Sequence, residues 1–335
     1  LSDYTKAKHT AVVQSGTAAI HLALRLLDVA KDDVVLCQSF TFIGSSSPIA
    51  YQQAQPVFID SESETWNMCP KALEMAIEHF LKLDKKPKAI IVVHLYGMPA
   101  KMKEIMAISK RYDIPIIEDA AEALGSTIDG YSCSSFGTFG ILSFNGNKII
   151  TTSGGGALQS NDESIIAKAR FLATQAKDNA PHYQHSTIGY NYRMSNIAAA
   201  IGVGQLEVLD QRVQARRANH AFYEDLFKEV EGVSFLKEPN GFFSNRWLTC
   251  VVFDQDKNHK LNPDKFRLHL EQDNIESRPL WKPMHLQPIY KNELYFGGQV
   301  AEQLFEKGLC LPSGSNLTKQ EKDRIQSSIF SFLDQ

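Results

Sequence analysis

Apolar residues in the first two thirds of the chain alternate between two spacings. Short continuous runs rich in Val and Ile predict buried strands, and these lie at residues 34–37, 56–59, 89–93 and 114–117. Between them, apolar residues recur at the i, i+3, i+4 and i+7 positions of amphipathic helices, at residues 20–27, at 73–81 and from 102 onward. This alternation predicts a doubly wound α/β domain, in which ligands bind at the carboxyl ends of the strands.

The last third of the chain has a different pattern. Residues 195–230 predict one long helix or two helices in sequence, and residues 247–253 predict a strand. Two later helix starts are marked by their caps: Asn262 is followed by a proline at the first helical position, and Thr318 begins a capping box. We therefore expect a large domain at residues 1–215 and a smaller α+β domain at residues 216–335.

Composition and charge exclude several classes of protein. The 335 residues carry 35 Lys+Arg against 38 Asp+Glu, and the net charge of -3 argues against a nucleic-acid partner. The apolar run at 89–93 is far too short to span a bilayer, so no membrane partner is expected. Five scattered cysteines, with no Cys-x-x-Cys spacing, favour a reducing cytoplasm and give no sign of a metal site. The chain starts with Leu rather than Met, so we expect either that it is processed or that its first residues are missing.

The common nucleotide and hydrolase signatures are absent. The sequence contains no Gly-x-Gly-x-x-Gly, no Walker A motif, no Gly-x-Ser-x-Gly elbow and no His-Glu-x-x-His. These absences weigh against Rossmann dehydrogenases, P-loop enzymes, serine hydrolases and zinc peptidases.

Four other features stand out, each with an ordinary alternative. Residues 15–18, Ser-Gly-Thr-Ala, open a helix and could bind an anion there or serve only as a cap. Asp119 ends an apolar strand, where its carboxylate could face a ligand or cap the next helix. Lys148 lies in the Gly/Asn/Ser-rich stretch 143–156 and could form a Schiff base or be a surface lysine beside a turn. Residues 189–196 could reach a phosphate or form a plain loop and N-cap.

Together these features supply an anion cradle, an acid for a pyridine nitrogen and a Schiff-base lysine, which are what pyridoxal phosphate requires. Six motifs follow one another along the chain: Ser-Gly-Thr-Ala-Ala (15–19), Gln-Ser-Phe-Thr-Phe (38–42), His-Leu-Tyr-Gly (94–97), Glu-Asp-Ala-Ala-Glu-Ala-Leu-Gly (118–125), Ser-Phe-Asn-Gly-Asn-Lys (143–148) and Gly-Tyr-Asn-Tyr-Arg-Met (189–194). This order resembles the DegT/DnrJ/EryC1/StrS family of pyridoxal-phosphate-dependent nucleotide-sugar aminotransferases. Residues 277–285 resemble the family's C-terminal Arg-Pro-x-Trp-x-Pro-x-His segment, so the resemblance covers essentially the whole chain.

The resemblance implies the aspartate aminotransferase-like fold type I, which is a doubly wound mixed sheet with a smaller C-terminal α+β domain. It also implies a homodimer with active sites at the interface. The implied catalytic residues are Lys148, which forms the Schiff base with the cofactor, and Asp119, which pairs with the pyridine nitrogen. Further implied cofactor contacts are Thr17, Ala18, Phe42, Glu122, Ser143 and, from the partner subunit, Asn191.

Two positions differ from the usual family pattern. Glu122 stands where many members have Gln or His, which leaves its protonation state open. Residues 153–156 read Ser-Gly-Gly-Gly where many members have Gly-Glu-Gly-Gly, so the acid of that segment is absent. Candidate contacts to the sugar nucleotide are Arg193, Arg278, Lys282 and His285, and a surface ion pair is the alternative for each.

The function implied by the resemblance is amino transfer from L-glutamate to a nucleotide-linked 4-keto-6-deoxy sugar, with pyridoxamine 5'-phosphate as the intermediate form of the cofactor. The stretch around Lys148 is most similar to enzymes that act at C4 of UDP-linked N-acetylated 4-keto sugars in bacterial glycan synthesis. A GDP-perosamine or dTDP-amino-sugar synthase is the alternative enzyme. A binding or regulatory protein that holds pyridoxal phosphate without turnover is the alternative of another class.

Overall fold

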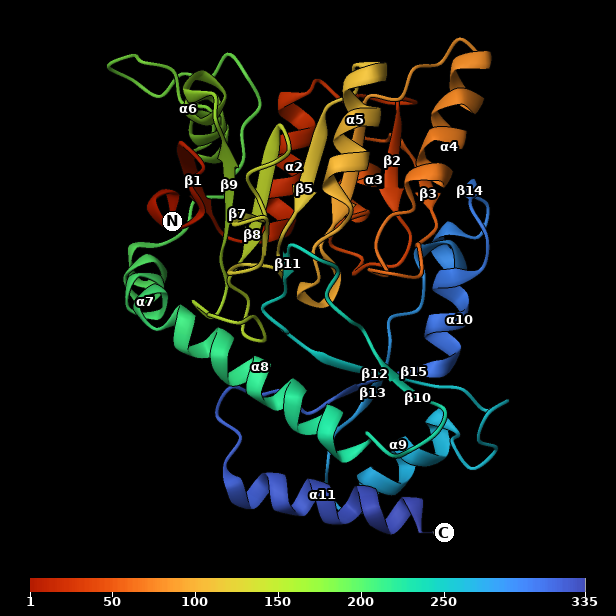
Figure 1. The fold of residues 1–335 in the computed structure, drawn as a ribbon. Coiled ribbons are helices and arrows are strands. Elements are labelled where there is room, and N and C mark those ends of the chain that lie inside the picture. Colours follow the sequence, from red (N-terminus) through yellow and green to blue (C-terminus); the bar gives the residue numbers. More distant parts are fainter. Residues whose placement is uncertain (335) are drawn as a thin grey trace.

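The computed structural model describes residues 1–334 and is built around one large mixed sheet (Figure 1). The strand order of this eight-stranded sheet is β1-β9-β8-β5-β4-β2-β3-β14. Its parallel core consists of β2 (Val34–Gln38), β3 (Gln55–Ile59), β4 (Ala89–Val93), β5 (Ile116–Asp119) and β8 (Phe139–Ser143). At one edge β9 (Gly156–Ser160) runs antiparallel to β8, and β1 (His9–Val13) runs antiparallel to β9.

Helices cover both faces of this sheet, because neighbouring residues of each buried strand point to opposite sides. Val35 and Cys37 of β2 pack on the side of α2 (Gly16–Leu26), α3 (Ser47–Tyr51) and α6 (Glu163–Ala173). Val34 and Leu36 pack on the side of α4 (Pro70–Lys82) and α5 (Met102–Tyr112). The sheet is therefore doubly wound, as the sequence predicts.

The C-terminal part forms a second, antiparallel sheet below the first (Figure 1). Its strands, in order, are β10 (Val233–Phe235), β12 (Thr249–Phe253), β15 (Gly308–Leu311) and β13 (Arg278–Pro279). Helices α9 (Pro263–Gln272) and α11 (Lys319–Leu333) pack on it through Phe266, Ile325 and Ile329. Two helices in sequence, α7 (Asn196–Glu207) and α8 (Leu209–Leu226), connect the two sheets, so the predicted boundary at residues 215/216 falls inside α8.

Two segments tie the parts together. Strand β14 (Tyr295–Phe296) returns from the C-terminal part and pairs with β3 of the large sheet. The Asp60 carboxylate, just after β3, accepts N–H groups of Gly298, Val300 and Ala301 and so caps α10 (Val300–Lys307). The remaining elements are short: α1 (Ser2–Thr5), η1 (Leu95–Gly97), η2 (Met284–Leu286), η3 (Pro288–Tyr290), and a small sheet of β11 (Phe242–Phe243), β6 (Thr127–Ile128) and β7 (Tyr131–Ser132).

Most predicted elements are confirmed within a few residues. Asn262 caps α9 and Thr318 caps α11 in a capping box with Glu321, as predicted. The sequence patterns did not predict β1, β8 and β9, which close one edge of the sheet. Within residues 1–334, no helix combines the length and the apolar character that crossing a bilayer requires.

Candidate active site

A cavity of about 430 Å³ lies at the carboxyl ends of β5 and β8 and at the first turn of α2. Three of the four sequence features line it together: the start of α2, the end of β5, and the loop that follows β8. The predicted site residues in its wall are Thr17, Phe42, Asp119, Glu122, Ser143, Lys148 and Arg278. Residues more than two hundred positions apart thus face one space, at the edge of the sheet where the strand pattern predicts a ligand.

The first turn of α2 forms an anion cradle. The Ser15 hydroxyl caps the helix by accepting the Ala18 N–H at 3.0 Å, so that N–H is already used. The N–H groups of Gly16 and Thr17 belong to the first helical turn, which leaves them without intrahelical partners. A β-carbon on Gly16 would lie 3.2 Å from the Ser143 β-carbon, which shows how closely the two segments approach. Two N–H groups and a hydroxyl therefore converge where a phosphate can bind.

Asp119 supplies a buried carboxylate at the end of β5. Its Oδ2 accepts a hydrogen bond from the Ser45 hydroxyl at 2.7 Å, and its Oδ1 accepts the Ala121 N–H at 3.1 Å. Ser45 is in turn 2.8 Å from the Thr41 hydroxyl. Neutral donors thus fix the carboxylate, and it has no ion-pair partner within residues 1–334. A protonated pyridine nitrogen is a fitting partner for such a group.

Lys148 brings a primary amine into the same cavity. Its Nζ lies 4.2 Å from the centre of the Trp247 ring and 3.5 Å from Glu122 Oε1. Trp247 is itself fixed, because its indole N–H donates to the Asn147 carbonyl at 2.9 Å. The amine is therefore held between an aromatic face and a carboxyl group rather than extended into solvent.

Glu122 is the second carboxyl group of the cavity. Burial raises its pKa to about 7, although the charge of Lys148 and the Tyr96 N–H, which donates to Oε2 at 2.7 Å, act to lower it. Tyr96 adopts a left-handed backbone conformation with φ 54°, and this turns its N–H toward the carboxyl group. Glu122 can therefore gain or lose a proton near neutral pH.

Phe42 completes the cavity on its open side. Its ring is half exposed and lies 5.6 Å from the Trp281 ring. An aromatic pair beside a carboxylate, an amine and an anion cradle matches the parts of pyridoxal phosphate: a flat ring with a basic nitrogen, an aldehyde and a phosphate. The residues present thus fit this cofactor.

Five predicted residues lie outside the cavity wall. Ala18 is one of them, and its N–H is already bound by the Ser15 hydroxyl. Asn191, Arg193 and Lys282 are exposed, and the Asn191 Oδ1 accepts a hydrogen bond from Gln175. His285 is engaged elsewhere: Nδ1 is 2.7 Å from the Ser39 hydroxyl, Nε2 is 3.1 Å from Glu302 Oε1, and the ring stacks on Tyr295. His285 therefore helps to pack the C-terminal segment against the large sheet.

Sequence reasoning missed several residues of the site. The sequence pattern predicts Trp247 only as the start of a strand and gives no role to Ser45 or Tyr96. Tyr96 lies within the His-Leu-Tyr-Gly motif, which is the one signal that could have drawn attention to it. Ser45 and Trp247 reach Asp119 and Lys148 only through the tertiary fold.

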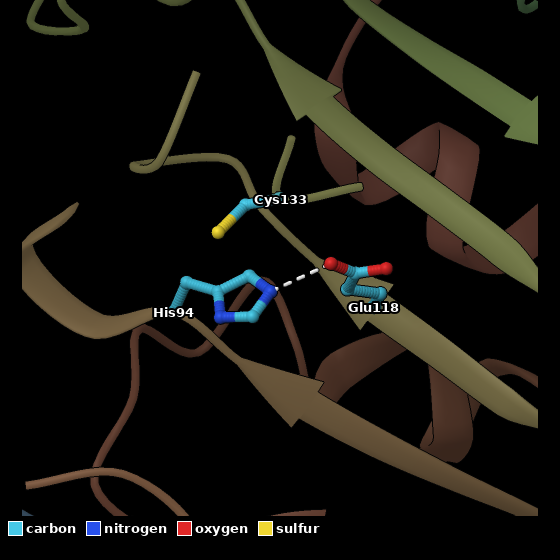
Figure 2. A group of neighbouring side chains, drawn as sticks. All are labelled: His94, Glu118 and Cys133. Atoms are coloured by element: carbon cyan, nitrogen blue, oxygen red, sulfur yellow. Dashed lines mark hydrogen bonds and ion pairs between the residues drawn. The ribbon is translucent and has the colours of Figure 1, made fainter. Parts of the chain in front are cut away.

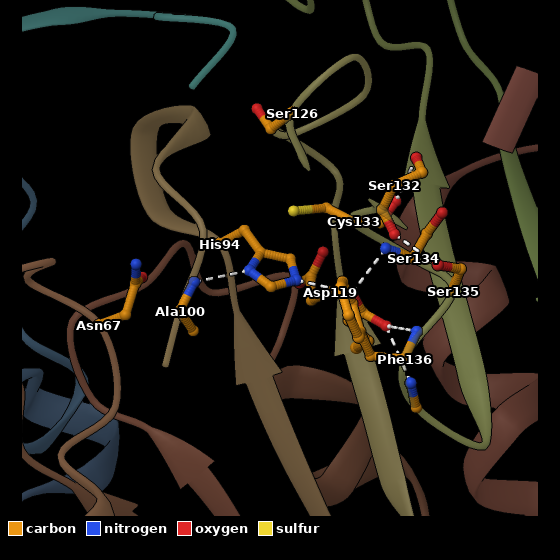
Figure 3. Close-up of polar contacts among 12 residues, drawn as sticks. Asn67, His94, Ala100, Asp119, Ser126, Ser132, Cys133, Ser134, Ser135 and Phe136 are labelled. Carbon is orange, nitrogen blue, oxygen red and sulfur yellow. Dashed lines mark hydrogen bonds and ion pairs between the residues drawn. The ribbon is translucent and has the colours of Figure 1, made fainter. Parts of the chain in front are cut away.

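A buried cluster behind the site brings together His94, Glu118 and Cys133 (Figure 2). His94 Nδ1 accepts the Ala100 N–H at 2.9 Å, so Nε2 carries the proton that it shares with Glu118 Oε1 at 2.8 Å. The Glu118 oxygens also accept the N–H groups of Ser134, Phe136 and Gly137 (Figure 3). Because the ring nitrogens of His94 and the carboxylate oxygens of Glu118 already have partners, we interpret the cluster as a network that fixes the loops flanking Asp119.

Relatives of known name match the chain over nearly its full length. EpsN of Bacillus subtilis (strain 168), whose name gives it provisionally as a pyridoxal phosphate-dependent aminotransferase, is 53% identical over 97% of this chain and 84% of its own length. The GDP-perosamine synthase of Escherichia coli O157:H7 is 35% identical over 97% of this chain and 86% of its own. A UDP-4-amino-4,6-dideoxy-N-acetyl-beta-L-altrosamine transaminase of Campylobacter jejuni is 30% identical over 100% of this chain and 88% of its own.

Solved structures agree with these matches. A DegT DnrJ EryC1 StrS aminotransferase from Brucella abortus superposes with a TM-score of 0.91 at 30% identity, covering 99% of this chain and 87% of that one. The fold is therefore the predicted aspartate aminotransferase-like fold type I, and the cofactor of these enzymes is pyridoxal phosphate. The model of the DegT/DnrJ/EryC1/StrS aminotransferase family matches residues 1–330, and the chain belongs to this family of sugar aminotransferases.

Proposed function

We propose that the protein transfers the amino group of L-glutamate to C4 of a nucleotide-linked 4-keto-6-deoxy sugar. The observation that carries this proposal is that one cavity holds the Lys148 amine, the Asp119 carboxylate and the anion cradle of α2. Bound pyridoxal phosphate supplies an electron sink and carries the amino group between the two substrates. All further steps are assigned to residues of the chain.

Each residue has a definite task in this proposal. Asp119, fixed by Ser45 and Ala121, holds the ring nitrogen in its protonated state. The Gly16 and Thr17 N–H groups and the Ser143 hydroxyl bind the phosphate, and Phe42 lies against the ring. Lys148 would bind the cofactor and then, as a free amine, remove the Cα proton of the amino donor; in the second half-reaction it would deliver a proton to the sugar carbon that receives the amino group. Its contact with Glu122 places a second titratable group beside that amine.

Two nucleotide classes are candidates for the acceptor. The sequence around Lys148 favours a UDP-linked N-acetylated sugar in bacterial glycan synthesis. The higher identity to GDP-perosamine synthases, 35% against 30%, makes a GDP-linked sugar the second candidate. Comparing turnover of UDP-, GDP- and dTDP-linked 4-keto-6-deoxy sugars with L-glutamate decides between them, and no turnover with any would contradict the proposed acceptor.

We further propose that the working form is a homodimer in the cytoplasm. Helix α7 has no buried residue although it is rich in apolar side chains: Ile197 is 73% exposed, Ile201 48% and Val203 65%. An apolar helix face of this kind needs a covering partner. In a dimer, Asn191 and Arg193 of one chain can reach the partner's cavity, which accounts for their absence from their own. The five unpaired cysteines fit a reducing compartment.

The Schiff-base role of Lys148 is tested with the cofactor-loaded protein. L-Glutamate should bleach its yellow absorbance, and borohydride should attach the cofactor to the peptide containing Lys148. Lys148→Ala should lower turnover by at least about 10²–10⁴-fold, the usual contribution of a general acid–base group. Normal turnover of this variant would disprove the mechanism. A protein that stays yellow with every amino donor would support the regulatory alternative instead.

The partner role of Asn191 is tested by complementation. Lys148→Ala and Asn191→Ala subunits are each expected to be impaired. When they are mixed and exchanged, a hybrid dimer has one site with an intact Lys148 and an intact partner Asn191, so about a quarter of all sites should recover. If activity does not rise above the sum of the separate variants, Asn191 does not act across the interface.

A further inference from the structure

A second groove opens beside the active-site cavity. It has a volume of about 750 Å³, within the usual range for small-molecule sites. The two spaces share Asn147, Trp247, Arg278 and Trp281 in their walls. The far wall of the groove consists of α8, the segment 311–317 and the start of α11. A ligand with its reacting end near Lys148 could therefore extend into this groove.

Arg216 of α8 lies in the groove wall with an uncompensated charge. The residue is buried, with 9% of its surface exposed. Nη1 donates to the Trp247 carbonyl at 2.8 Å, whereas the buried Nε has no partner. Burial lowers the pKa of Arg216 to about 10, which leaves the guanidinium charged at neutral pH. Buried charges in proteins are normally paired, so this cation lacks an anion.

The other charged groups of the groove do not supply that anion. Glu276 is bound to Arg278 through a hydrogen bond of 2.6 Å from Nε. Glu321 accepts the N–H and the hydroxyl of Thr318 in the capping box. Within residues 1–334, no carboxylate forms an ion pair with Arg216. An anion from outside the chain is the remaining candidate partner.

A single residue, Trp247, contacts both Arg216 and the Lys148 amine. Trp247 connects the two, because its carbonyl accepts from Arg216 and its ring lies 4.2 Å from Lys148 Nζ. An anion bound at Arg216 is thus connected to the amine through Trp247. Trp247 and Trp281 between them offer aromatic surface along the route.

We propose that the groove binds the diphosphate of the nucleotide-linked substrate and that Arg216 is its principal cationic contact. This inference rests on the proposed function, and it assigns the diphosphate to a residue other than Arg193, Lys282 and His285. A planar guanidinium suits phosphate oxygens because it can donate two parallel hydrogen bonds. A carboxylate of the amino donor has related oxyanion chemistry, and the experiment separates the two ligands.

The experiment measures binding of UDP and GDP to the cofactor-loaded enzyme by calorimetry. Arg216→Gln should raise the dissociation constant of whichever nucleotide binds more tightly by about tenfold or more. Arg212→Gln, one turn earlier on α8 and outside the groove, is the matched control and should stay within about twofold of the wild type. An unchanged dissociation constant in Arg216→Gln, or no binding of either nucleotide to the wild type, would overturn the inference.

The amino-donor reaction keeps the inference separate from the proposed function. Bleaching of the wild-type enzyme by L-glutamate tests transamination without any nucleotide. If Arg216→Gln binds the nucleotide normally but needs far more glutamate for bleaching, the groove binds the donor carboxylate and the inference is wrong. If Arg216→Gln does not fold, hydrogen exchange of the wild type decides: UDP or GDP should protect amides of residues 313–317, and no protection there would overturn the proposal.

Discussion

Glu122 and Lys148 form a contact of 3.5 Å inside the cavity, where one group is a carboxyl whose pKa is raised to about 7. The Tyr96 N–H holds the other carboxyl oxygen, so the side chain cannot turn away from the amine. Glu122, which titrates near neutral pH, therefore lies next to Lys148, the group that moves protons in the proposed reaction. This arrangement makes the protein's stability depend on pH in a predictable direction.

The first prediction concerns the cofactor-free protein. Glu122 has a higher pKa in the folded state than its ordinary value of 4.5, so between pH 4.5 and 7 the folded state binds more protons than the unfolded state. The free energy of unfolding should therefore fall as pH rises through this window, by up to about 3 kcal/mol. Glu122→Gln cannot ionise and should lack this loss. Urea unfolding of both proteins from pH 5 to 8 measures it.

The comparison with the variant is needed because two histidines act in the opposite direction. Burial lowers the pKa of His21 to about 4 and that of His220 to about 3, so both make the protein more stable as pH rises through the acid range. The wild type and Glu122→Gln both contain these histidines, so their contribution cancels when the free energies of unfolding of the two proteins are subtracted. Equal pH slopes for wild type and Glu122→Gln would show that Glu122 is ionised throughout.

A second prediction separates the charge of Asp119 from its orientation. Asp119→Asn removes the charge that faces the cavity and should slow bleaching by L-glutamate by about 10²–10³-fold. Ser45→Ala removes one hydrogen bond to the carboxylate. It should raise the activation free energy of bleaching by about 1.5–3 kcal/mol. Asp162→Asn, which removes a carboxylate charge at the surface N-cap of α6 but keeps its capping oxygen, is the control and should leave the rate unchanged. A full rate for Asp119→Asn would contradict the assignment of this residue.

A third prediction tests whether the cluster of His94, Glu118 and Cys133 is a hydrogen-bond network or a metal site. Glu118→Gln places an amide N–H against backbone donors in the interior and should lower the free energy of unfolding by about 3–5 kcal/mol. Cys133→Ala should cost much less, because it leaves the hydrogen bond between His94 and Glu118 and the backbone N–H groups on Glu118 in place. Stability should also be unaffected by chelators. Bound zinc lost in Cys133→Ala would contradict the network interpretation.

The sequence predicts the parts of this protein that depend on local pattern. The strands at 34–38 and 89–93 and the caps at Asn262 and Thr318 follow from residues close together in the chain. Asp119 and Lys148 stand in motifs, so both could be named in advance. Long-range contacts could not: His285 is bound to Ser39, 246 positions away, and Trp247 reaches Lys148 from the segment before β12. The burial of Arg216 without an anion likewise becomes visible only in three dimensions.

A fourth prediction concerns α7. If its apolar face is covered by a second copy of the chain, Ile201→Glu should place a charge in the interface and convert the dimer to a monomer, as measured by light scattering. Leu268→Glu on α9 is a matched control, since Leu268 and Ile201 are both 48% exposed. A wild type that is already monomeric, or a dimer that persists in Ile201→Glu, would show that α7 does not form the interface.

The last prediction concerns the glycine that lets strand β9 approach the anion cradle. A β-carbon on Gly156 would lie 2.4 Å from the Ser15 carbonyl carbon and 2.5 Å from the Gly16 nitrogen, and neither backbone atom can move aside alone. Gly156→Ala should therefore displace the first turn of α2, which lowers the stability by about 1–3 kcal/mol and weakens the binding of pyridoxal phosphate. Thermal unfolding of the cofactor-free protein and a cofactor titration measure the two effects.

Gly146→Ala is the control for that experiment, because its added β-carbon would meet nothing closer than the Ser153 carbonyl at 4.0 Å. The control should bind the cofactor like the wild type. If Gly156→Ala lost stability but kept its cofactor affinity, the phosphate would be held by groups other than the first turn of α2. Since the N–H groups of Gly16 and Thr17 are fixed by that turn alone, the two measurements should change together.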